Sequence, residues 1–140
     1  MTNMRVFIVL ACAASLAAVG CSSSSSSAGT EGGVAVTEQD FSIAASPSSA
    51  PAGEVSFDIT NNGPSAHEFL VVKSDEDPGS LTVKDGIVPE DSLDLIDEQE
   101  DIAPSTTATL TVDLEAGSYI LMCNVNGHYQ QGMHAGFTVT

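Results

Sequence analysis

The stretch from Cys123 to Met133 reads CNVNGHYQQGM and sets three residues with metal-binding side chains at equal intervals. Four residues separate Cys123 from His128, and four more separate His128 from Met133. Asn126-Gly127 and Gly132 favour turns, so we expect a tight loop between two strands. A loop of this kind can bring all three side chains to one point.

A fourth donor must come from another part of the chain, and His67 is the best placed. It follows the turn-forming segment Asn61–Pro64, at the start of an apolar run. One thiolate, two imidazoles and a weakly bound thioether form the trigonal set that is typical of electron-transfer copper. Soft sulfur favours Cu(I) and imidazole suits both Cu(I) and Cu(II), so a rigid site of this kind changes little on reduction. The sequence therefore predicts one copper ion bound by His67, Cys123, His128 and Met133.

Each of these residues has a more ordinary explanation when it is taken alone. A single histidine on a strand is more often structural than a ligand, and a buried cysteine is often inert. Their occurrence together, at this spacing and in a domain with no other thiol, favours the metal. Zinc also suits one cysteine with two histidines and is expected only as a contaminant, which would be colourless and redox-inert. His134 directly follows Met133, so we expect it to point to the surface and not to the metal.

The sequence on both sides of the loop has the alternation of half-buried β-strands. Apolar residues recur at every second position in 55–59 and 110–114, and turn formers separate such runs. In the strand before the loop, the odd-numbered residues from Tyr119 to Cys123 share one face, whereas Ile120 and Met122 share the other. An interrupted first strand is expected between residues 34 and 43. Seven or eight short strands without a long helix predict an all-β Greek-key sandwich.

The segment 75–101 departs from this pattern, because eleven acidic residues accompany a single base, Lys84. We interpret it as a long excursion with a helical turn near Ser92–Glu98, followed by a short edge strand. The acids do not have the spacing of an EF-hand loop. A solvated acidic loop is the simpler interpretation, and a dedicated cation or partner site is the alternative.

Residues 1–20 have the features of an export signal, because Arg5 precedes an apolar run that is too short to span a bilayer comfortably. The run ends in AVGC, which is similar to a lipoprotein cleavage site with Cys21 as the lipidated residue; ordinary secretion is the alternative. Residues 21–33 then form a flexible Ser- and Gly-rich tether. The copper-binding domain is expected at 34–140, anchored by lipid to the outer face of the cell membrane, in the periplasm or at the cell surface.

Charge and cysteine content restrict the possible partners. Removal of the signal would leave Lys73 and Lys84 against 19 acidic residues, a net charge of −17. Such a chain lacks the basic surface that nucleic acid requires. An acidic surface favours redox partners with basic docking surfaces, although adaptation to saline surroundings would produce the same composition. Cys123 is the one cysteine left in the folded domain, and a metal ligand explains why an exported protein keeps an unpaired thiol.

Tyr119–Val139, together with the segment AHEF at 66–69, resembles the copper-binding core of the cupredoxins, such as plastocyanin and azurin. The equal gaps on both sides of His128 are more similar to rusticyanin and auracyanin than to plastocyanin, which has a shorter gap between the cysteine and the histidine. The motifs that carry the resemblance occupy about thirty residues, and the strand pattern extends it over the domain.

The resemblance also implies roles for individual residues. The two histidines would bind copper through Nδ1, Cys123 through its sulfur, and Met133 as the axial ligand. The carbonyl of Ala66 lies where azurin has a distant fifth contact. Plastocyanin and azurin have asparagine where this chain has Glu68, so the usual hydrogen bond at that position is not expected, and a carboxylate there is expected to affect the reduction potential.

A one-electron carrier on the extracytoplasmic side of a membrane is the function that this pattern favours. The alternative is a module that stores or delivers copper, although such proteins usually have open sites rich in Met or His. An enzyme is not expected, because the chain has no His-x-His pair for further copper ions and no Gly-x-Ser-x-Gly motif. We expect a monomer.

Overall fold

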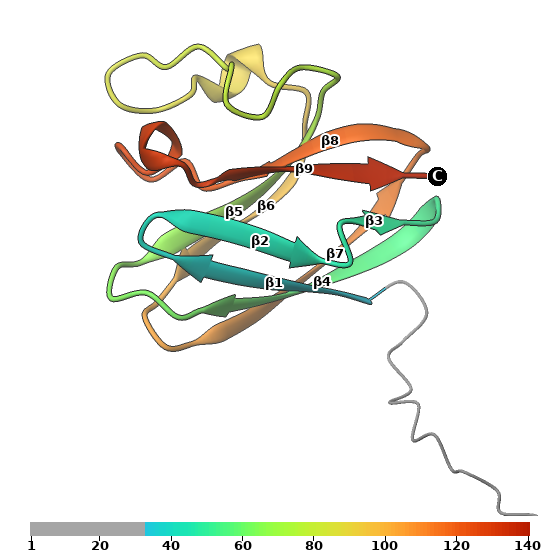
Figure 1. The fold of residues 1–140 in the computed structure, drawn as a ribbon, viewed down its shortest axis with the longest axis horizontal. Coiled ribbons are helices and arrows are strands. Elements are labelled where there is room, and N and C mark those ends of the chain that lie inside the picture. Colours follow the sequence, from blue (N-terminus) through green and yellow to red (C-terminus); the bar gives the residue numbers. More distant parts are fainter. Residues whose placement is uncertain (1–32) are drawn as a thin grey trace, which may run out of the picture.

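The computed structural model describes residues 33–140, which form nine strands and two single-turn 3-10 helices (Figure 1). The strands make two sheets, as expected for an all-β sandwich. The predicted signal peptide, Cys21 and the tether up to residue 32 lie outside the described residues. Within residues 33–140, no helix has the length and apolar character needed to cross a bilayer.

The first sheet has four strands in the order β2-β1-β4-β7. Their bounds are Gly33–Gln39 for β1, Ser42–Ser46 for β2, Gly53–Asn61 for β4 and Thr107–Leu114 for β7. β1 runs parallel to β4, whereas the other neighbours are antiparallel. The interrupted first strand expected from the sequence is in fact a hairpin, with Asp40 and Phe41 as the turn between β1 and β2.

The second sheet has five strands in the order β3-β9-β8-β5-β6. Their bounds are Ser49–Ala50 for β3, His67–Lys73 for β5, Leu95–Ile102 for β6, Gly117–Met122 for β8 and His134–Val139 for β9. β5 lies between β8 and β6 and is antiparallel to both. The hairpin and the two-residue β3 explain why the count is nine and not seven or eight.

The main core lies between the two sheets and sets the position of the strand ends. Phe57 of the first sheet packs against Phe69 and Phe137 of the second, with ring centroids 5.2 and 5.3 Å apart. All three side chains are buried. Truncating one of them to alanine would cost about 3–5 kcal/mol. Because β5 and β8 are held by this core, His67 at the start of β5 and Cys123 after β8 are held as well.

β5 and β8 are also buried on their outer face. Residues of a second apolar cluster point away from the main core and are covered by the excursion between β5 and β6 (Figure 1); they are Leu70, Val72, Ile120 and Met122, with Val88 from the excursion. The two faces predicted for the strand before the loop are confirmed, because Tyr119 and Leu121 lie in the main core instead.

The excursion is tied to the loop that follows β8. The side chain of Asn124 donates to the carbonyl of Val88 at 3.0 Å and accepts from its N–H at 2.8 Å. Gly127 N–H donates to Gly86 O at 2.8 Å. The acidic segment therefore supports the loop by backbone contacts, in addition to carrying charge.

The acidic segment contains one short helix followed by an edge strand, as expected, but the helical turn ends at Ser92, so its predicted position at Ser92–Glu98 was wrong. The 3-10 helix η1 lies at Glu90–Ser92, and β6 already begins at Leu95. β6 pairs with β5, which satisfies backbone groups of a buried strand, and this outweighs the local tendency to form a helix. β6 is an edge strand, and its acidic side chains discourage pairing with another chain.

Candidate metal centre

Three donor side chains converge on one point: one comes from a strand, and two come from the loop between β8 and β9. His67 is the first residue of β5, Cys123 directly follows β8, and His128 lies in the loop just before the 3-10 helix η2 (Tyr129–Gln131). Their ligand atoms all lie within 4.8 Å of one another, and all three residues are buried. The loop between β8 and β9 thus brings Cys123 and His128 to His67.

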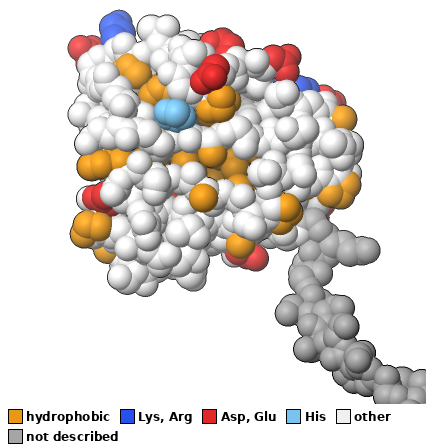
Figure 2. Space-filling model, in the orientation of Figure 1, with side chains coloured by type: hydrophobic (Ala, Val, Ile, Leu, Met, Phe, Trp, Pro, Cys, Tyr) orange, Lys and Arg blue, Asp and Glu red, His pale blue; other side chains and the backbone are white. Residues whose placement is uncertain are grey.

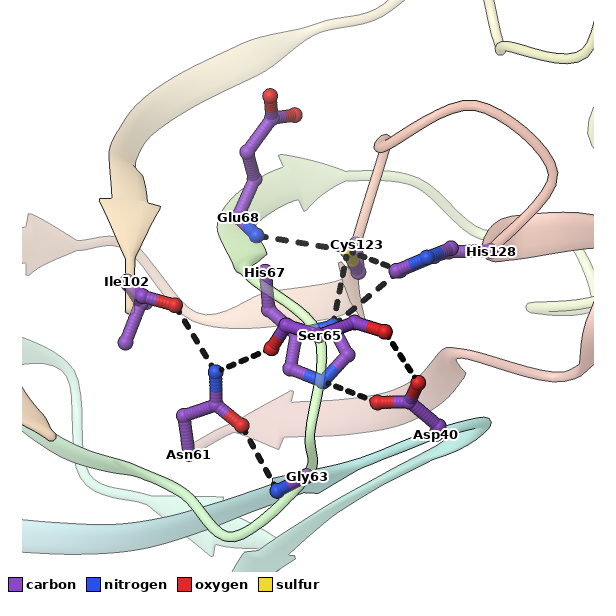
Figure 3. A network of polar contacts seen from close by, with 9 residues as sticks. All are labelled: Asp40, Asn61, Gly63, Ser65, His67, Glu68, Ile102, Cys123 and His128. Carbon is purple, nitrogen blue, oxygen red and sulfur yellow. Dashed lines mark hydrogen bonds and ion pairs between the residues drawn. The ribbon is translucent and has the colours of Figure 1, made fainter. Parts of the chain in front are cut away.

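The atoms that face one another are the two Nδ1 nitrogens and the sulfur (Figure 3). The Nδ1 atoms of His67 and His128 are 3.2 Å apart, and Cys123 Sγ lies 3.9 and 3.5 Å from them, respectively. Burial lowers the pKa of His67, and the nearby His128 lowers it further, so the neutral ring keeps a lone pair for a metal. Burial raises the pKa of the Cys123 thiol to about 11. A bound cation stabilises a thiolate in such surroundings, so the three residues fit a metal ion.

Met133 is fully buried and closes the loop through its backbone. Cys123 N–H donates to Met133 O at 3.0 Å, and Met133 N–H donates to His128 O at 3.2 Å. Gly132 permits this closure because its φ of 116° lies in the left-handed region that favours glycine. The backbone of the loop is therefore fixed at each of its three predicted ligands.

A family model described as "Cupredoxin-like domain" matches residues 10–134. The chain belongs to the cupredoxin-like family. Copper is the cofactor, and His67, Cys123, His128 and Met133 are arranged as a type 1 copper site.

Several solved structures share the fold of this cupredoxin. Auracyanin from Roseiflexus castenholzii has a TM-score of 0.59 at 19% identity, with 80% of this chain and 99% of that chain covered. An azurin from Methylomonas sp. strain J has a TM-score of 0.58 at 16% identity, with 77% and 97% covered. Auracyanin A from Chloroflexus aurantiacus, a "blue" copper protein, has a TM-score of 0.55 at 19% identity, with 77% and 98% covered. No curated protein sequence matches the chain significantly.

Glu68 contacts the cupredoxin site through its backbone. Its N–H donates to Cys123 Sγ at 3.4 Å, while its carboxylate points away from the sulfur (Figure 3). Burial raises the pKa of Glu68, and the charges of Glu100 and Glu98 on β6 raise it further. The carboxylate therefore belongs to the acidic surface of β5 and β6, whereas the amide supports the thiolate.

His134 and Met122 lie outside the group of donors. His134 begins β9 and packs against Tyr129, with ring centroids 4.9 Å apart, and it is not among the residues that share the ligand point. Met122 belongs to the second apolar cluster, as its strand face predicted. Neither side chain competes with Met133 for the fourth position.

One neighbour of the site was missed in the sequence. Asp40, in the turn between β1 and β2, places Oδ1 3.1 Å from Nε2 of His67, and its Oδ2 accepts a hydrogen bond from Ser65 Oγ at 2.5 Å. The hydrogen bond from Ser65 is the main reason why the pKa of Asp40 is lowered. Residues 34–43 were expected to be one interrupted strand, and nothing in that pattern places residue 40 beside His67.

The segment that leads into His67 is held by the side chain of Asn61. Its amide donates to Ser65 O at 2.8 Å and to Ile102 O at 2.9 Å, and its oxygen accepts from Gly63 N–H at 2.8 Å (Figure 3). Asn61 is fully buried. The predicted turn before His67 is thus a rigid structure with its polar groups satisfied.

Proposed function

We propose that this cupredoxin is a one-electron carrier in which Nδ1 of His67 and His128, Sγ of Cys123 and the thioether of Met133 would hold one copper ion. The observation that carries the proposal is the convergence of two imidazole nitrogens and one thiol sulfur within 4.8 Å in a buried site. Copper supplies one-electron exchange between Cu(II) and Cu(I) when it is bound. The chain supplies the ligands and keeps them in place.

The hydrogen bonds around the donors support rapid electron transfer. Cys123 is fixed on both sides, by its own N–H to Met133 O and by the N–H of Glu68 to its sulfur. His67 is anchored by a core strand. Ligands held in this way move little when the charge of the metal changes, so little reorganisation accompanies each electron.

His128 offers the path to the surface. Its residue is 8% exposed, whereas His67 and Cys123 are fully buried. The ring of the exposed Phe41 packs edge-on against it, with centroids 5.2 Å apart. A partner that docks over Phe41 would come within a short distance of a ligand, and we propose that electrons enter and leave through His128.

The test is a visible spectrum recorded during titration with Cu(II). We expect an intense blue or green colour from thiolate-to-copper charge transfer at one equivalent of copper. Cys123→Ser should abolish it, because the charge-transfer donor is lost. Met122→Leu, in the neighbouring position but in the second apolar cluster, should keep the colour and serves as the matched control. Wild-type protein that stays colourless with stoichiometric Cu(II) would refute the type 1 assignment.

Burial of the site favours a carrier over a protein that stores or delivers copper, and over an enzyme. Delivery requires ligands that a recipient can reach, and catalysis requires a position open to substrate, whereas two of the three convergent donors are fully buried. A carrier should exchange electrons with a small redox reagent much faster than it releases copper to a chelator. Rapid release of Cu(I) to a chelator, together with slow electron exchange, would favour delivery instead.

We also propose that the protein is exported and anchored by a lipid at Cys21, on the outer face of the cell membrane. The support is the apolar run before AVGC and the serine run after it. Cys21→Ser should move the protein from the membrane fraction to a soluble or unprocessed form. Wild-type protein that is recovered after export without lipid, by mass spectrometry, would contradict the anchor.

We propose that the redox partner is a protein with a basic docking surface. We also propose that this chain is a monomer when it binds that partner. On the face shown in Figure 2, apolar side chains occupy the middle and acidic ones lie mainly toward the margins. Electron-transfer rates with a cationic partner should fall as salt is added, because screening weakens the attraction. If the acidity reflects a saline habitat instead, salt should stabilise the protein and leave those rates unchanged. Sedimentation would test the monomer.

A further inference from the structure

We infer that Asp40 is a positioning residue for copper: its carboxylate accepts the Nε2 proton of His67, directs Nδ1 of that ring to the metal and favours Cu(II) over Cu(I). The inference rests on the proposed function, because it assumes that His67 is a copper ligand. It adds a specific carboxylate, in the turn between β1 and β2, that sets the reduction potential through its contact with His67.

The geometry joins two segments that are distant in the sequence. Asp40 lies in the β1–β2 turn, and His67 begins β5 in the other sheet. Asp40 Oδ1 and His67 Nε2 are 3.1 Å apart, in the arrangement of an ion-pair contact and not of a linear hydrogen bond. Among the described residues, neither atom has a hydrogen-bond partner. Each atom is thus the natural partner of the other.

Ser65 and Gly63 allow the contact between Asp40 and His67 (Figure 3). Ser65 Oγ donates to Asp40 Oδ2 at 2.5 Å, which turns the other oxygen toward the ring. Gly63 leaves room, because a Cβ at that position would lie 2.5 Å from Asp40 Oδ1 and 3.0 Å from His67 Nε2. Asn61 in turn accepts from Gly63 N–H. The carboxylate is therefore held in a fitted position, with its side chain only 17% exposed.

The carboxylate of Asp40 would affect copper through the protonated nitrogen of His67. An imidazole that binds a metal through Nδ1 carries its proton on Nε2, and a buried N–H needs an acceptor. A carboxylate in that role fixes the tautomer and the orientation of the ring and makes the other nitrogen a stronger electron donor. A stronger donor and a nearby negative charge both favour the more highly charged Cu(II).

The competing explanation is that Asp40 serves only the hairpin turn. Asp40→Asn separates the two explanations, because asparagine keeps the size of the side chain, an oxygen for Ser65 and a good turn propensity, and removes the charge. Asp58→Asn is the matched control: Asp58 is an exposed carboxylate on β4 that also accepts a hydroxyl hydrogen bond, from Thr109.

We expect Asp40→Asn to remain coloured and to lose Cu(II) affinity relative to Cu(I) by about tenfold. That ratio corresponds to a rise of about 59 mV in the reduction potential for a one-electron couple. Asp58→Asn should leave the potential unchanged. If Asp40→Asn is blue but its potential matches that of Asp58→Asn, the inference fails while the proposed function stands. If the wild type does not bind copper as a coloured complex, the proposed function itself fails.

A second measurement needs no variant to fold. In the wild-type Cu(I) protein, nitrogen-15 NMR should find His67 protonated at Nε2, with a proton that exchanges slowly with water and resonates far downfield. A rapidly exchanging proton, or a His67 ring that binds the metal through Nε2, would overturn the inference.

Discussion

His67 and His128 both direct Nδ1 toward the other donors, but they differ in secondary structure, exposure and neighbouring residues. His67 begins a strand of the core, is fully buried and contacts the carboxylate of Asp40. His128 lies in a loop, is 8% exposed and contacts the ring of Phe41. We call His67 with Asp40 the inner side of the site, and His128 with Phe41 the outer side.

The difference separates two tasks of an electron carrier. A charge acts more strongly on the relative stability of Cu(II) and Cu(I) where solvent screens it less, and the carboxylate of Asp40 lies against the fully buried ring of His67. Exchange of electrons with a partner requires a ligand near the surface, as on the outer side. Two ligands of the same chemical type can therefore be specialised by their surroundings alone.

The largest expected effect comes from replacing each histidine by glycine. Both His67→Gly and His128→Gly should lose the colour, because each removes one of three strong ligands. Added imidazole should restore it in His128→Gly, where the vacated space opens to the surface, and not in His67→Gly, where the space is enclosed. The visible spectrum with and without imidazole, together with the copper content, measures both.

Circular dichroism should accompany this comparison, since removing the fully buried ring of His67 leaves a cavity that is expected to cost a few kcal/mol. Recovery of colour in a folded His67→Gly and not in His128→Gly would reverse the assignment of inner and outer sides.

A smaller effect is expected for Met133, which is enclosed although it belongs to the loop. Met133→Leu removes electron donation that favours Cu(II), so the potential should rise; Met133→Gln supplies a harder oxygen donor, so it should fall. Each tenfold change in the affinity ratio corresponds to about 59 mV. Both variants should keep copper, which voltammetry and metal analysis can check. Equal potentials in Met133→Leu, Met133→Gln and the wild type would exclude an axial role for this residue.

The sandwich could be predicted because its signals are local. The alternation around Phe57 and the equal spacing from Cys123 to Met133 each occupy a few residues. The Nδ1 atoms of the two histidines and Cys123 Sγ then converge as the loop pattern and the resemblance implied.

The inner side could not be predicted, because it depends on which strands become neighbours. Asp40 reaches His67 only because β1 pairs with β4, and the chain passes from the end of β4 into the turn before β5. The same limit explains the error at Ser92–Glu98, where pairing of β6 with β5 overrides a local helix tendency. Long-range pairing leaves no signature in a window of ten residues.

Glu38 is a carboxyl group in the core near the inner side, and its protonation state shows whether that part of the core excludes charge. It points inward from β1, is fully buried, and both carboxyl oxygens lack a hydrogen-bond partner among the described residues. Burial raises its pKa from 4.5 to about 8. The folded state therefore keeps a proton that the unfolded state releases, and this group makes stability fall as pH rises from about 4.5 to about 8.

Glu38→Gln should remove that part of the pH dependence. Relative to the wild type, the variant should gain on the order of 3–4 kcal/mol between pH 5 and pH 8, as measured by urea unfolding of the copper-free protein. Glu54→Gln, an exposed residue on β4, is the control and should follow the wild type. If the difference between Glu38→Gln and the wild type is the same at both pH values, Glu38 is ionised in the fold and must have a partner.

The smallest effect is expected for His134, the immediate neighbour of Met133. Its ring packs on Tyr129 and lies close to Gly79, on the side of the excursion and away from the donor group. His134→Ala should keep the colour and the potential, and lose about 0.5–1.5 kcal/mol of stability with the contact to Tyr129. Spectra, voltammetry and thermal unfolding should be recorded for His134→Ala and for Met133→Leu. The comparison distinguishes the roles of two adjacent residues whose side chains point in opposite directions. If His134→Ala loses the metal while Met133→Leu leaves the potential unmoved, the ligands are three histidines with Cys123, and the outer side of the site extends to β9.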